Sequence, residues 1–365
     1  MVYPLIFQPV YKDYLWGGRR LADWGKALPP SGTVAESWEL SCHPNGPSVI
    51  ANGPLAGQVF DEVWKKDPEA WLGRDMSERD RTKFPLLIKL IDANAALSVQ
   101  VHPTDAYAFK NEQGEYGKNE MWYVVYAPEG AKLIAGVKSG TTREQFAEAI
   151  ADGTCEDCLQ QVPVKAGDCI NIPAGLVHAI TEGLIIYEVQ QNSDTTYRVY
   201  DYNRRDAAGN LRPLHVAKAL EVIDYTNAGG HVRFPGLNLT AAGPLRRRML
   251  VINRYFTVEE DRLDGVCSFQ ARGGQFRILT CLGGQLTITA DLASGPEDLV
   301  INMGQTVFIP ATLGTYQLEG QDALFVSSYT TEVNQLWTAL KQAAPPERWD
   351  ELMGLRPYAA SLLQH

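Results

Sequence analysis

Two polar side chains interrupt an apolar stretch of the chain at a spacing that suits metal binding. The stretch reads ALSVQVHPTD and carries Gln100 and His102 two residues apart. Side chains alternate between the two faces of a strand, so these two would point the same way, with Val99 and Val101 on the opposite face. An amide oxygen and an imidazole nitrogen on one face can both serve as ligands of a divalent cation.

Two further ligand types occur in similar strand contexts. Glu120 opens the aromatic segment EMWYVVYA, and His178 lies just past the proline turn of IPAGLVHAI. Two imidazoles, one carboxylate and one amide suit zinc, and also manganese, iron, cobalt or nickel. The set contains no cysteine, and mixed nitrogen and oxygen ligands are more typical of a working metal than of a structural zinc. A single histidine on a strand is more often packed than ligating, so the prediction depends on the four residues occurring together.

Short strands must position these residues. The chain contains 32 Gly and 21 Pro, and its apolar runs are mostly short, which favours strands and turns. Runs rich in β-branched and aromatic residues predict strands at 83–93, 96–102, 120–127, 131–137, 167–173 and 183–190. Helical spacing and end signals predict helices at 57–73, 141–153 and 212–224, and a helical tail after about Thr331.

An internal repeat decides the predicted architecture. GDCINIPAGLVHAI starts at Gly167, and GQTVFIPATLGTYQL starts 137 residues later, at Gly304. A strand, a proline-closed turn and a returning strand recur in double-sheet jelly rolls. We therefore expect a mainly β fold with two jelly-roll barrels and a few peripheral helices. Thr315 replaces His178 in the second copy, whose body has no histidine, so only the first barrel is expected to hold a metal.

Composition narrows the functional classes. The net charge of -10 gives no general basic surface for nucleic acid, so an anionic ligand would need a local pocket of Lys or Arg. We find no basic leader followed by an apolar segment and no apolar run long enough to cross a membrane. The six scattered cysteines are expected to be reduced thiols in a cytoplasmic protein, with CEDC at 155–158 a loop rather than a zinc or redox site.

Four motifs in order resemble one enzyme family. LSVQVHP, GKNEMWY, IPAGLVHAI and QQNSDTTYRVYDYNR, preceded by WGG and AESWELSCHPNGPS, are similar to the short bacterial form of the type I mannose-6-phosphate isomerases. The resemblance extends to about Asp206 and is weaker beyond it. It implies a cupin-type double barrel that binds one zinc ion per chain and interconverts mannose 6-phosphate and fructose 6-phosphate.

The resemblance also implies roles for individual residues. It makes Gln100, His102, Glu120 and His178 the zinc ligands. Arg198 falls on the family's catalytic arginine, and Lys118 on a lysine tied to substrate handling or proton transfer. Three further residues match positions that line the substrate pocket: Trp16, Glu188 and Asp194. Unlike in the long forms, Glu120 and His178 are only 58 residues apart in this chain and no large helical insertion separates them, so the pocket rim and phosphate contacts stay open.

The domain boundaries follow from the repeat and the resemblance. We expect a catalytic cupin domain at 1–240, a second, metal-free cupin-like barrel at 241–330, and a helical tail at 331–365. The basic run at 246–248 would be a solvated linker between the barrels. A monomer and a homodimer are both compatible with the sequence.

The expected chemistry passes through a cis-enediol, in which charge builds on oxygen as carbon loses its proton. A divalent metal and preorganised positive charge can stabilise that oxygen. Arg198 would serve there or bind the phosphate, Lys118 could act as the base, and Glu188 and Asp194 are rival bases or orienting partners. Two alternatives remain: a non-haem iron cupin oxidoreductase, and a cupin that binds sugar phosphate without turning it over.

Overall fold

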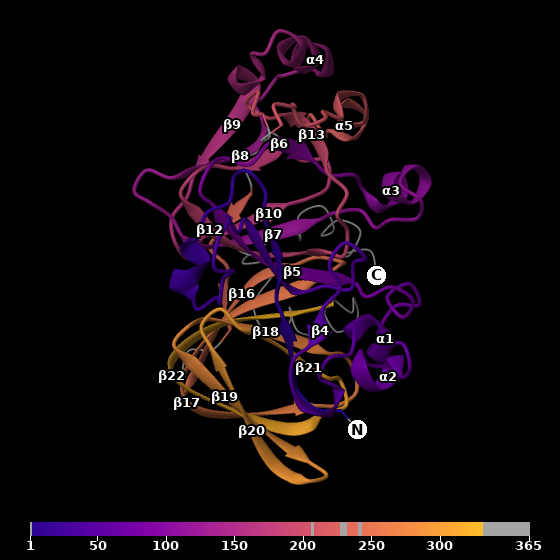
Figure 1. Ribbon diagram of the computed structural model, residues 1–365, viewed down its shortest axis with the longest axis vertical. Coiled ribbons are helices and arrows are strands. Elements are labelled where there is room, and N and C mark those ends of the chain that lie inside the picture. Colours follow the sequence, from indigo (N-terminus) through magenta and orange to yellow (C-terminus); the bar gives the residue numbers. More distant parts are fainter. Residues whose placement is uncertain (1, 206–207, 227–231, 240–242, 331–365) are drawn as a thin grey trace.

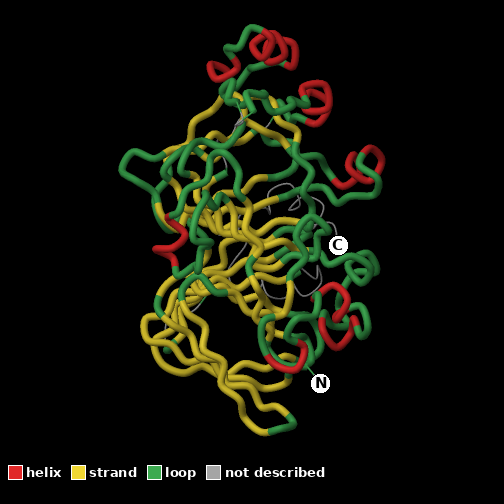
Figure 2. The backbone as a smooth tube through the Cα atoms, viewed as in Figure 1, coloured by secondary structure: helices red, strands yellow, loops and turns green. Residues whose placement is uncertain are grey.

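Strands dominate the fold, as the sequence predicts. The computed structural model describes residues 2–205, 208–226, 232–239 and 243–330. Within these residues the strands form sheets of ten, seven and five members, which follow one another along the long axis of Figure 1. Figure 2 shows that strands fill the body of the molecule and that helices lie at its periphery. The prediction of a mainly β fold with few peripheral helices is confirmed.

The seven-stranded sheet crosses the middle of the molecule. Its order is β14-β10-β7-β12-β5-β3-β2, and its strands are β14 (Arg233–Phe234), β10 (Cys169–Ile172), β7 (Glu120–Tyr126), β12 (Leu184–Gln191), β5 (Leu86–Ala93), β3 (Glu36–Leu40) and β2 (Val10–Lys12). The five-stranded sheet has the order β13-β6-β11-β8-β9. Its strands are β13 (Tyr197–Tyr200), β6 (Val99–Val101), β11 (His178–Ile180), β8 (Lys132–Val137) and β9 (Leu159–Pro163).

The seven-stranded sheet separates two apolar cores. Every residue of β5 and β12 is buried, because both faces of this sheet are covered. Alternate side chains such as Ile88 and Tyr187 face the core shared with the C-terminal strands, whereas Ile91 and Ile186 face the core toward the five-stranded sheet. Polar residues on this second face are therefore aimed at the space between the two sheets.

The ten-stranded sheet contains the C-terminal strands and two strands from the N-terminal part. Its main order is β15-β16-β17-β22-β18-β21-β1-β4, and β19 and β20 attach beside β22. The strands are β15 (Leu237–Asn238), β16 (Leu245–Ile252), β17 (Thr257–Ala271), β22 (Gly314–Tyr329), β18 (Arg277–Gly283), β21 (Thr306–Ile309), β1 (Leu5–Gln8), β4 (Val49–Ile50), β19 (Gln285–Leu292) and β20 (Gly295–Asn302). β1 pairs directly with β21, so the chain's first strand closes onto its last third.

The internal repeat is confirmed strand by strand. Both β10 and β21 begin two residues after a glycine with positive φ, Gly167 and Gly304, and both end at the isoleucine of an Ile-Pro step. Each is followed by a turn and a returning strand, β11 in the first copy and β22 in the second. His178 starts β11, and its counterpart Thr315 lies at the start of β22.

The helices are short. They are α1 (Phe60–Trp64), α2 (Pro68–Trp71), α3 (Asp105–Asn111), α4 (Arg143–Ala151) and α5 (Val216–Val222), with 3-10 helices η1 (Arg20–Trp24), η2 (Gly53–Leu55) and η3 (Cys155–Cys158). The predicted helices at 141–153 and 212–224 correspond to α4 and α5, and α4 starts with a capping box in which Thr142 and Gln145 exchange hydrogen bonds. The CEDC segment forms η3 between α4 and β9. The predicted helical tail at 331–365 lies outside the described residues.

Two predictions about local structure were wrong. The single helix expected at 57–73 is split into α1 and α2, because Asp67 caps a new helix whose first residue is Pro68. The basic run at 246–248 is part of β16 and not a linker. There Arg247 points inward to Asp261, with Nε 2.7 Å from the carboxylate, and Arg248 pairs with Glu260 at 2.6 Å. Acidic partners on the neighbouring strand β17 thus pair with two of the three arginines.

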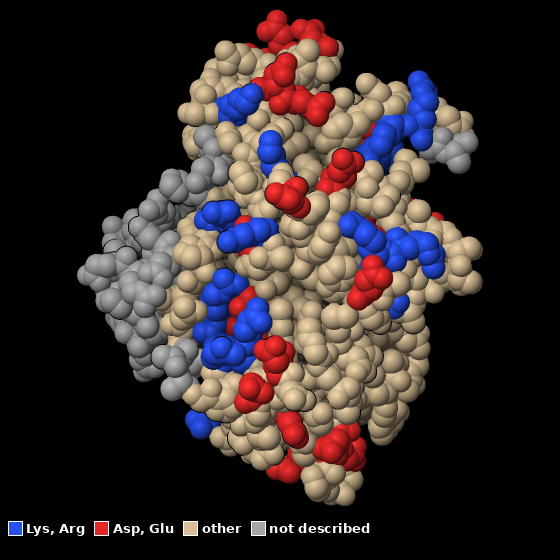
Figure 3. All heavy atoms as spheres, turned by 90° about the vertical axis from the view of Figure 1, so that its left-hand side faces the viewer, with Lys and Arg blue, Asp and Glu red and all other residues tan. Residues whose placement is uncertain are grey.

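Charge is unevenly distributed over the surface. Figure 3 shows the side that lies to the left in Figure 1: Lys and Arg side chains gather over its middle, and Asp and Glu gather toward its two ends. Among the described residues, no helix has the length and apolar character that crossing a bilayer requires.

Candidate metal centre

Three buried side chains meet between the two sheets of the N-terminal part. Nε2 of His102 lies 3.1 Å from Nε2 of His178 and 3.2 Å from Oε1 of Glu120. Nε2 of His178 lies 3.8 Å from Oε2 of Glu120. All three residues are almost fully excluded from solvent. One nitrogen from each imidazole and one carboxylate oxygen therefore converge on a common point.

The hydrogen bonds of the two imidazoles fix which nitrogen faces this point. Nδ1 of His102 lies 2.9 Å from the carbonyl oxygen of Thr195, and Nδ1 of His178 lies 2.8 Å from that of Leu176. A carbonyl can only accept, so each Nδ1 carries the proton and each Nε2 presents a lone pair. Two lone pairs 3.1 Å apart repel unless a cation lies between them. Oε2 of Glu120 is also buried without a hydrogen-bond partner. The two Nε2 lone pairs and the carboxylate oxygen fit a divalent cation. A backbone carbonyl that accepts a hydrogen bond from Nδ1 is the usual support for a histidine that binds a metal through Nε2.

Strand pairing brings Gln100 and Arg198 alongside. On the five-stranded sheet, Gln100 of β6 lies opposite His178 of β11 on one side and opposite Arg198 of β13 on the other. Directly paired residues of neighbouring strands project from the same face. Gln100 thus stands between the imidazole and the guanidinium, and it lines the cavity beside the three ligands.

Lys118 lies at the edge of the candidate centre. Its Nζ is 2.7 Å from Oε1 of Glu120 and 3.2 Å from Nε2 of His102. Burial, and then the charge of Lys118, lower the pKa of His102 to about 3. Burial acts to raise the pKa of Glu120, but Lys118, His102 and His178 together outweigh it and hold that pKa well below its usual range. Near neutral pH, His102 is therefore neutral and Glu120 is anionic, and these are the forms that bind a metal.

A cavity of about 270 Å³ opens beside the centre. Seven of the predicted site residues line it, and only His102 and His178 lie behind, against Glu120. The seven are Trp16, Gln100, Lys118, Glu120, Glu188, Asp194 and Arg198. The structure thus gathers every predicted site residue in one place, although these residues come from both sheets and from the loop before η1.

Glu188 is a buried acid held by two donors. Nε1 of Trp122 donates to it at 2.7 Å, and Nζ of Lys89 lies 3.1 Å from its other oxygen. Burial and the nearby charge of Glu120 raise the pKa of Glu188 to about 7 even though Lys89 acts in the opposite direction. Glu188 can therefore hold or release a proton near neutral pH.

Positive and negative groups alternate around the rest of the cavity. Asp194 accepts from Asn45 at 2.7 Å, and although burial acts to raise its pKa, Lys89 and this bond lower it. Arg198 donates from Nη1 to the carbonyl of Pro213 at 2.8 Å, and its Nε is buried without a partner. Burial and the charge of Arg212 lower the pKa of Arg198.

Sequence reasoning missed four ionisable residues that line the cavity: Tyr14, Glu36, Lys89 and Arg212. Lys89 lies within the apolar strand β5 and reaches both Glu188 at 3.1 Å and Glu36 at 3.5 Å. A lysine inside a fully buried strand was a usable signal, because a buried ammonium needs an anionic partner. Arg212 pairs with Asp201 and carried no comparable sequence signal.

Comparison with known proteins gives concordant matches. Residues 5–125 match the family described as phosphomannose isomerase type I, catalytic domain, and residues 246–329 match the mannose-6-phosphate isomerase cupin domain. The chain is 38% identical to a probable mannose-6-phosphate isomerase, GmuF, of Bacillus subtilis over 90% of this chain and 99% of that protein. It is 38% identical to the mannose-6-phosphate isomerase of Streptococcus mutans over 91% of this chain and all of that protein.

Solved structures agree. The crystal structure of the Bacillus subtilis mannose 6-phosphate isomerase superposes with a TM-score of 0.80 at 32% identity, covering 89% of this chain and 99% of that one. A more distant structure, described as a mannose 6-phosphate isomerase bound with zinc and yttrium, shares the fold at 16% identity with a TM-score of 0.69, covering 90% of this chain and all of that one.

Proposed function

Because this chain belongs to the type I phosphomannose isomerases, which are aldose–ketose isomerases, we propose that it interconverts mannose 6-phosphate and fructose 6-phosphate at one zinc ion per chain. His102, Glu120 and His178 would hold the ion, with Gln100 as a fourth ligand. The observation that carries the zinc site is the pair of Nε2 lone pairs 3.1 Å apart beside a buried carboxylate.

The resident ion would supply Lewis acidity toward a sugar oxygen in the adjoining cavity. The chain's own residues account for the ion's placement. Each imidazole is fixed by a backbone carbonyl, and Lys118 fixes Glu120 from the side. Trp16 supplies an apolar wall to the same cavity. A position next to an open cavity fits a working metal better than a closed structural site.

The isomerisation moves a proton from C2 of the aldose to C1 through a cis-enediol, and a second proton between the two oxygens. Lys118 and Glu188 both line the cavity and can carry these protons. Glu188 has its pKa raised to about 7 by burial and by Glu120, so its carboxylate can take a proton and return it near neutral pH. The variants Lys118→Met and Glu188→Gln would show which of the two residues is the base. Loss of the base removes proton exchange between C2 and solvent, whereas loss of a positioning group leaves a slower exchange.

The phosphate of the substrate needs positive charge at the cavity. Arg198 and Arg212 both line the cavity. Arg212 is held in place by Asp201, which accepts a hydrogen bond from its Nε at 2.7 Å. A guanidinium grips a phosphate with two parallel bonds. We propose that Arg198 either binds the phosphate or stabilises the enediol oxygen, and that Arg212 supports it.

One experiment tests the function against its alternatives. Turnover of mannose 6-phosphate should be abolished by a chelator and restored by zinc, with one zinc per chain by metal analysis. Turnover that is unaffected by complete metal removal would refute the metal site. Activity restored only by iron together with oxygen consumption would indicate a cupin oxidoreductase, and tight substrate binding without turnover would indicate a binding module.

The division of labour between the two parts is a further proposal. All the candidate ligands and cavity residues fall within 1–240, whereas the second family match falls at 246–329. We propose that 1–240 is the catalytic domain and that 241–330 is a metal-free barrel that supports it. The cysteines are unpaired, in keeping with a cytoplasmic protein.

A further inference from the structure

We propose that Asp105 is a positioning residue for the metal centre, and that it links the segment carrying Lys118 and Glu120 to the C-terminal strands through Arg254. This inference rests on the proposed metal-dependent function. Asp105 opens α3, three residues after the candidate ligand His102, and its carboxylate accepts hydrogen bonds from Arg79 and from the backbone N–H of Gly117.

The carboxylate of Asp105 gathers donors from four parts of the chain. On one side it accepts from the backbone N–H of Gly117 at 2.8 Å and from Nε2 of Gln191 at 3.0 Å. On the other side it accepts from Arg79 at 2.7 and 3.1 Å and from Arg254 at 3.3 Å. Gly117 belongs to the segment that carries Lys118 and Glu120, and Gln191 ends the neighbouring strand β12. Arg79 and Arg254 surround the outer side of the carboxylate.

These contacts fix the backbone on both sides of Lys118. Gln191 donates to Asp105 and in turn accepts two hydrogen bonds from Asn119. The backbone N–H of Asn119 lies 3.1 Å from Oε1 of Gln191, and the side-chain amide nitrogen of Asn119 lies 2.6 Å from it. The N–H of Lys118 donates to the carbonyl of Pro103 at 3.1 Å. The segment that carries Lys118 and leads into Glu120 is thus bonded to the segment that follows His102 directly at Gly117 and Lys118, and through Gln191 at Asn119.

Direct backbone contact explains why this arrangement needs glycine at 117. A Cβ added to Gly117 would lie 2.4 Å from the backbone nitrogen of Asp105 and 2.6 Å from the carbonyl carbon of Thr104. The two ligand-bearing segments therefore touch without an intervening side chain. A shift of the Asp105 carboxylate would be transmitted to Glu120 and to His102 together, because packed backbone moves as a unit.

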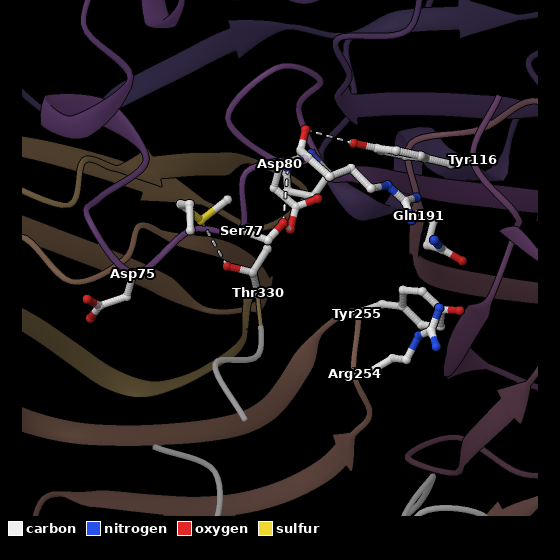
Figure 4. A pocket seen from close by; sticks show the side chains of 11 residues that line it. Asp75, Ser77, Asp80, Tyr116, Gln191, Arg254, Tyr255 and Thr330 are labelled. Atoms are coloured by element: carbon white, nitrogen blue, oxygen red, sulfur yellow. Dashed lines mark hydrogen bonds between the residues drawn. The ribbon is translucent and has the colours of Figure 1, made fainter. Parts of the chain in front are cut away.

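The outer contacts of Asp105 border a cleft of about 440 Å³ between the N-terminal and C-terminal parts. In Figure 4, Tyr116 and Gln191 lie on one side of this cleft, and Arg254 and Tyr255, from the loop between β16 and β17, lie opposite. Arg79 stacks on Tyr116, with its guanidinium carbon 3.6 Å from the ring centroid. The Arg254–Asp105 pair connects this loop to the metal-site segment.

Substitution of Asp105 by Asn tests the positioning role in the full-length, zinc-loaded enzyme. An amide keeps the size of the side chain but cannot accept from Gly117, Gln191 and both arginines at once. We expect kcat for mannose 6-phosphate to fall about tenfold with KM within about threefold, and zinc transfer to a chelator to become about tenfold faster, as for other groups that orient metal ligands. Amide hydrogen exchange in 116–120 should rise in parallel.

Asp80→Asn is the matched control. Asp80 lines the same cleft, but its side chain bonds to Ser77 within its own loop. If Asp105→Asn changes kcat, zinc release and exchange in 116–120 no more than Asp80→Asn does, the positioning role is overturned. A wild-type enzyme without metal-dependent turnover would instead refute the proposed function, whatever the variants show.

Arg254→Ala tests the link to the C-terminal strands by a change outside the N-terminal part, at a side chain that is 53% exposed. We expect zinc release to become two- to fourfold faster, and we expect little further change when the substitution is added to Asp105→Asn, because both act through one contact. Unchanged release in the single variant, or effects that multiply in the double variant, would refute the link.

Discussion

Replacing Arg198 by Ala separates metal binding from turnover. Arg198 lies opposite Gln100, which in turn lies opposite His178. Neighbouring strands are about 4.8 Å apart, so the backbone positions of Arg198 and His178 are separated by about 10 Å and the guanidinium is not a ligand. A unit charge about 10 Å from a dication contributes repulsion on the order of 3 kcal/mol at an effective dielectric constant of about 20. Zinc should therefore bind at least as tightly in the variant as in the wild type.

Turnover of mannose 6-phosphate, in contrast, should fall in the Arg198→Ala variant. Removing one preorganised donor from a site where negative charge develops costs about 3–4 kcal/mol, which corresponds to a hundred- to thousandfold fall in kcat. Steady-state kinetics with mannose 6-phosphate and metal analysis of the same sample would measure both effects. Arg246→Ala is the matched control, because Arg246 is an exposed arginine on β16, far from the cavity lining. A kcat within threefold of wild type would remove Arg198 from the mechanism, and loss of zinc would show that it supports the metal centre instead.

Three other predictions follow from the contacts described. His178→Ala should lose zinc and activity together, measured by metal analysis and turnover; retention of stoichiometric zinc would exclude it as a ligand. Gly117→Ala should destabilise the protein by about 1–3 kcal/mol, because its Cβ meets backbone, whereas Gly283→Ala, whose Cβ would have a nearest neighbour at 3.4 Å, should have little effect in the same urea titration. The third concerns pH. Burial acts to raise the pKa of Asp105, but Arg79 lowers it to about 2, below the ordinary 3.8, so its stabilisation is present above pH 4 and is lost as pH falls through 2. Allowing for solvent screening, about 1 kcal/mol is involved, and the stability gap between wild type and Asp105→Asn should narrow between pH 5 and pH 2.5; a constant gap would contradict this.

Local patterns in the sequence were sufficient for much of the β framework. The 137-residue repeat predicted equivalent strands, and β10 and β21 have equivalent bounds. The prediction of α4 relied on capping chemistry, which depends only on residues close in sequence. The helix at 57–73 was predicted as one element because its apolar spacing continues through Pro68, and the cap at Asp67 outweighed that spacing.

Contacts between distant strands could not be predicted in the same way. The inward direction of Arg247 depends on Asp261 lying opposite it on β17, a pairing that no local pattern specifies. The placement of Lys89 in the candidate site depends on β5 lying between β3 and β12, which brings Glu36 and Glu188 to either side. The motif resemblance pointed to the candidate ligands, whereas the residues that surround them became visible only once the sheet order was known.

The pairing of β1 with β21 has a consequence for biosynthesis. Leu5 lies opposite Phe308, so one edge of β1, whose other edge pairs with the nearby β4, has no partner until some 300 later residues have been made. Strand pairing over such a separation is slow, and until it happens one border of β21 stays open to other chains. Deleting residues up to Gln8 should therefore yield aggregates during expression, even though no residue of the catalytic cavity is removed.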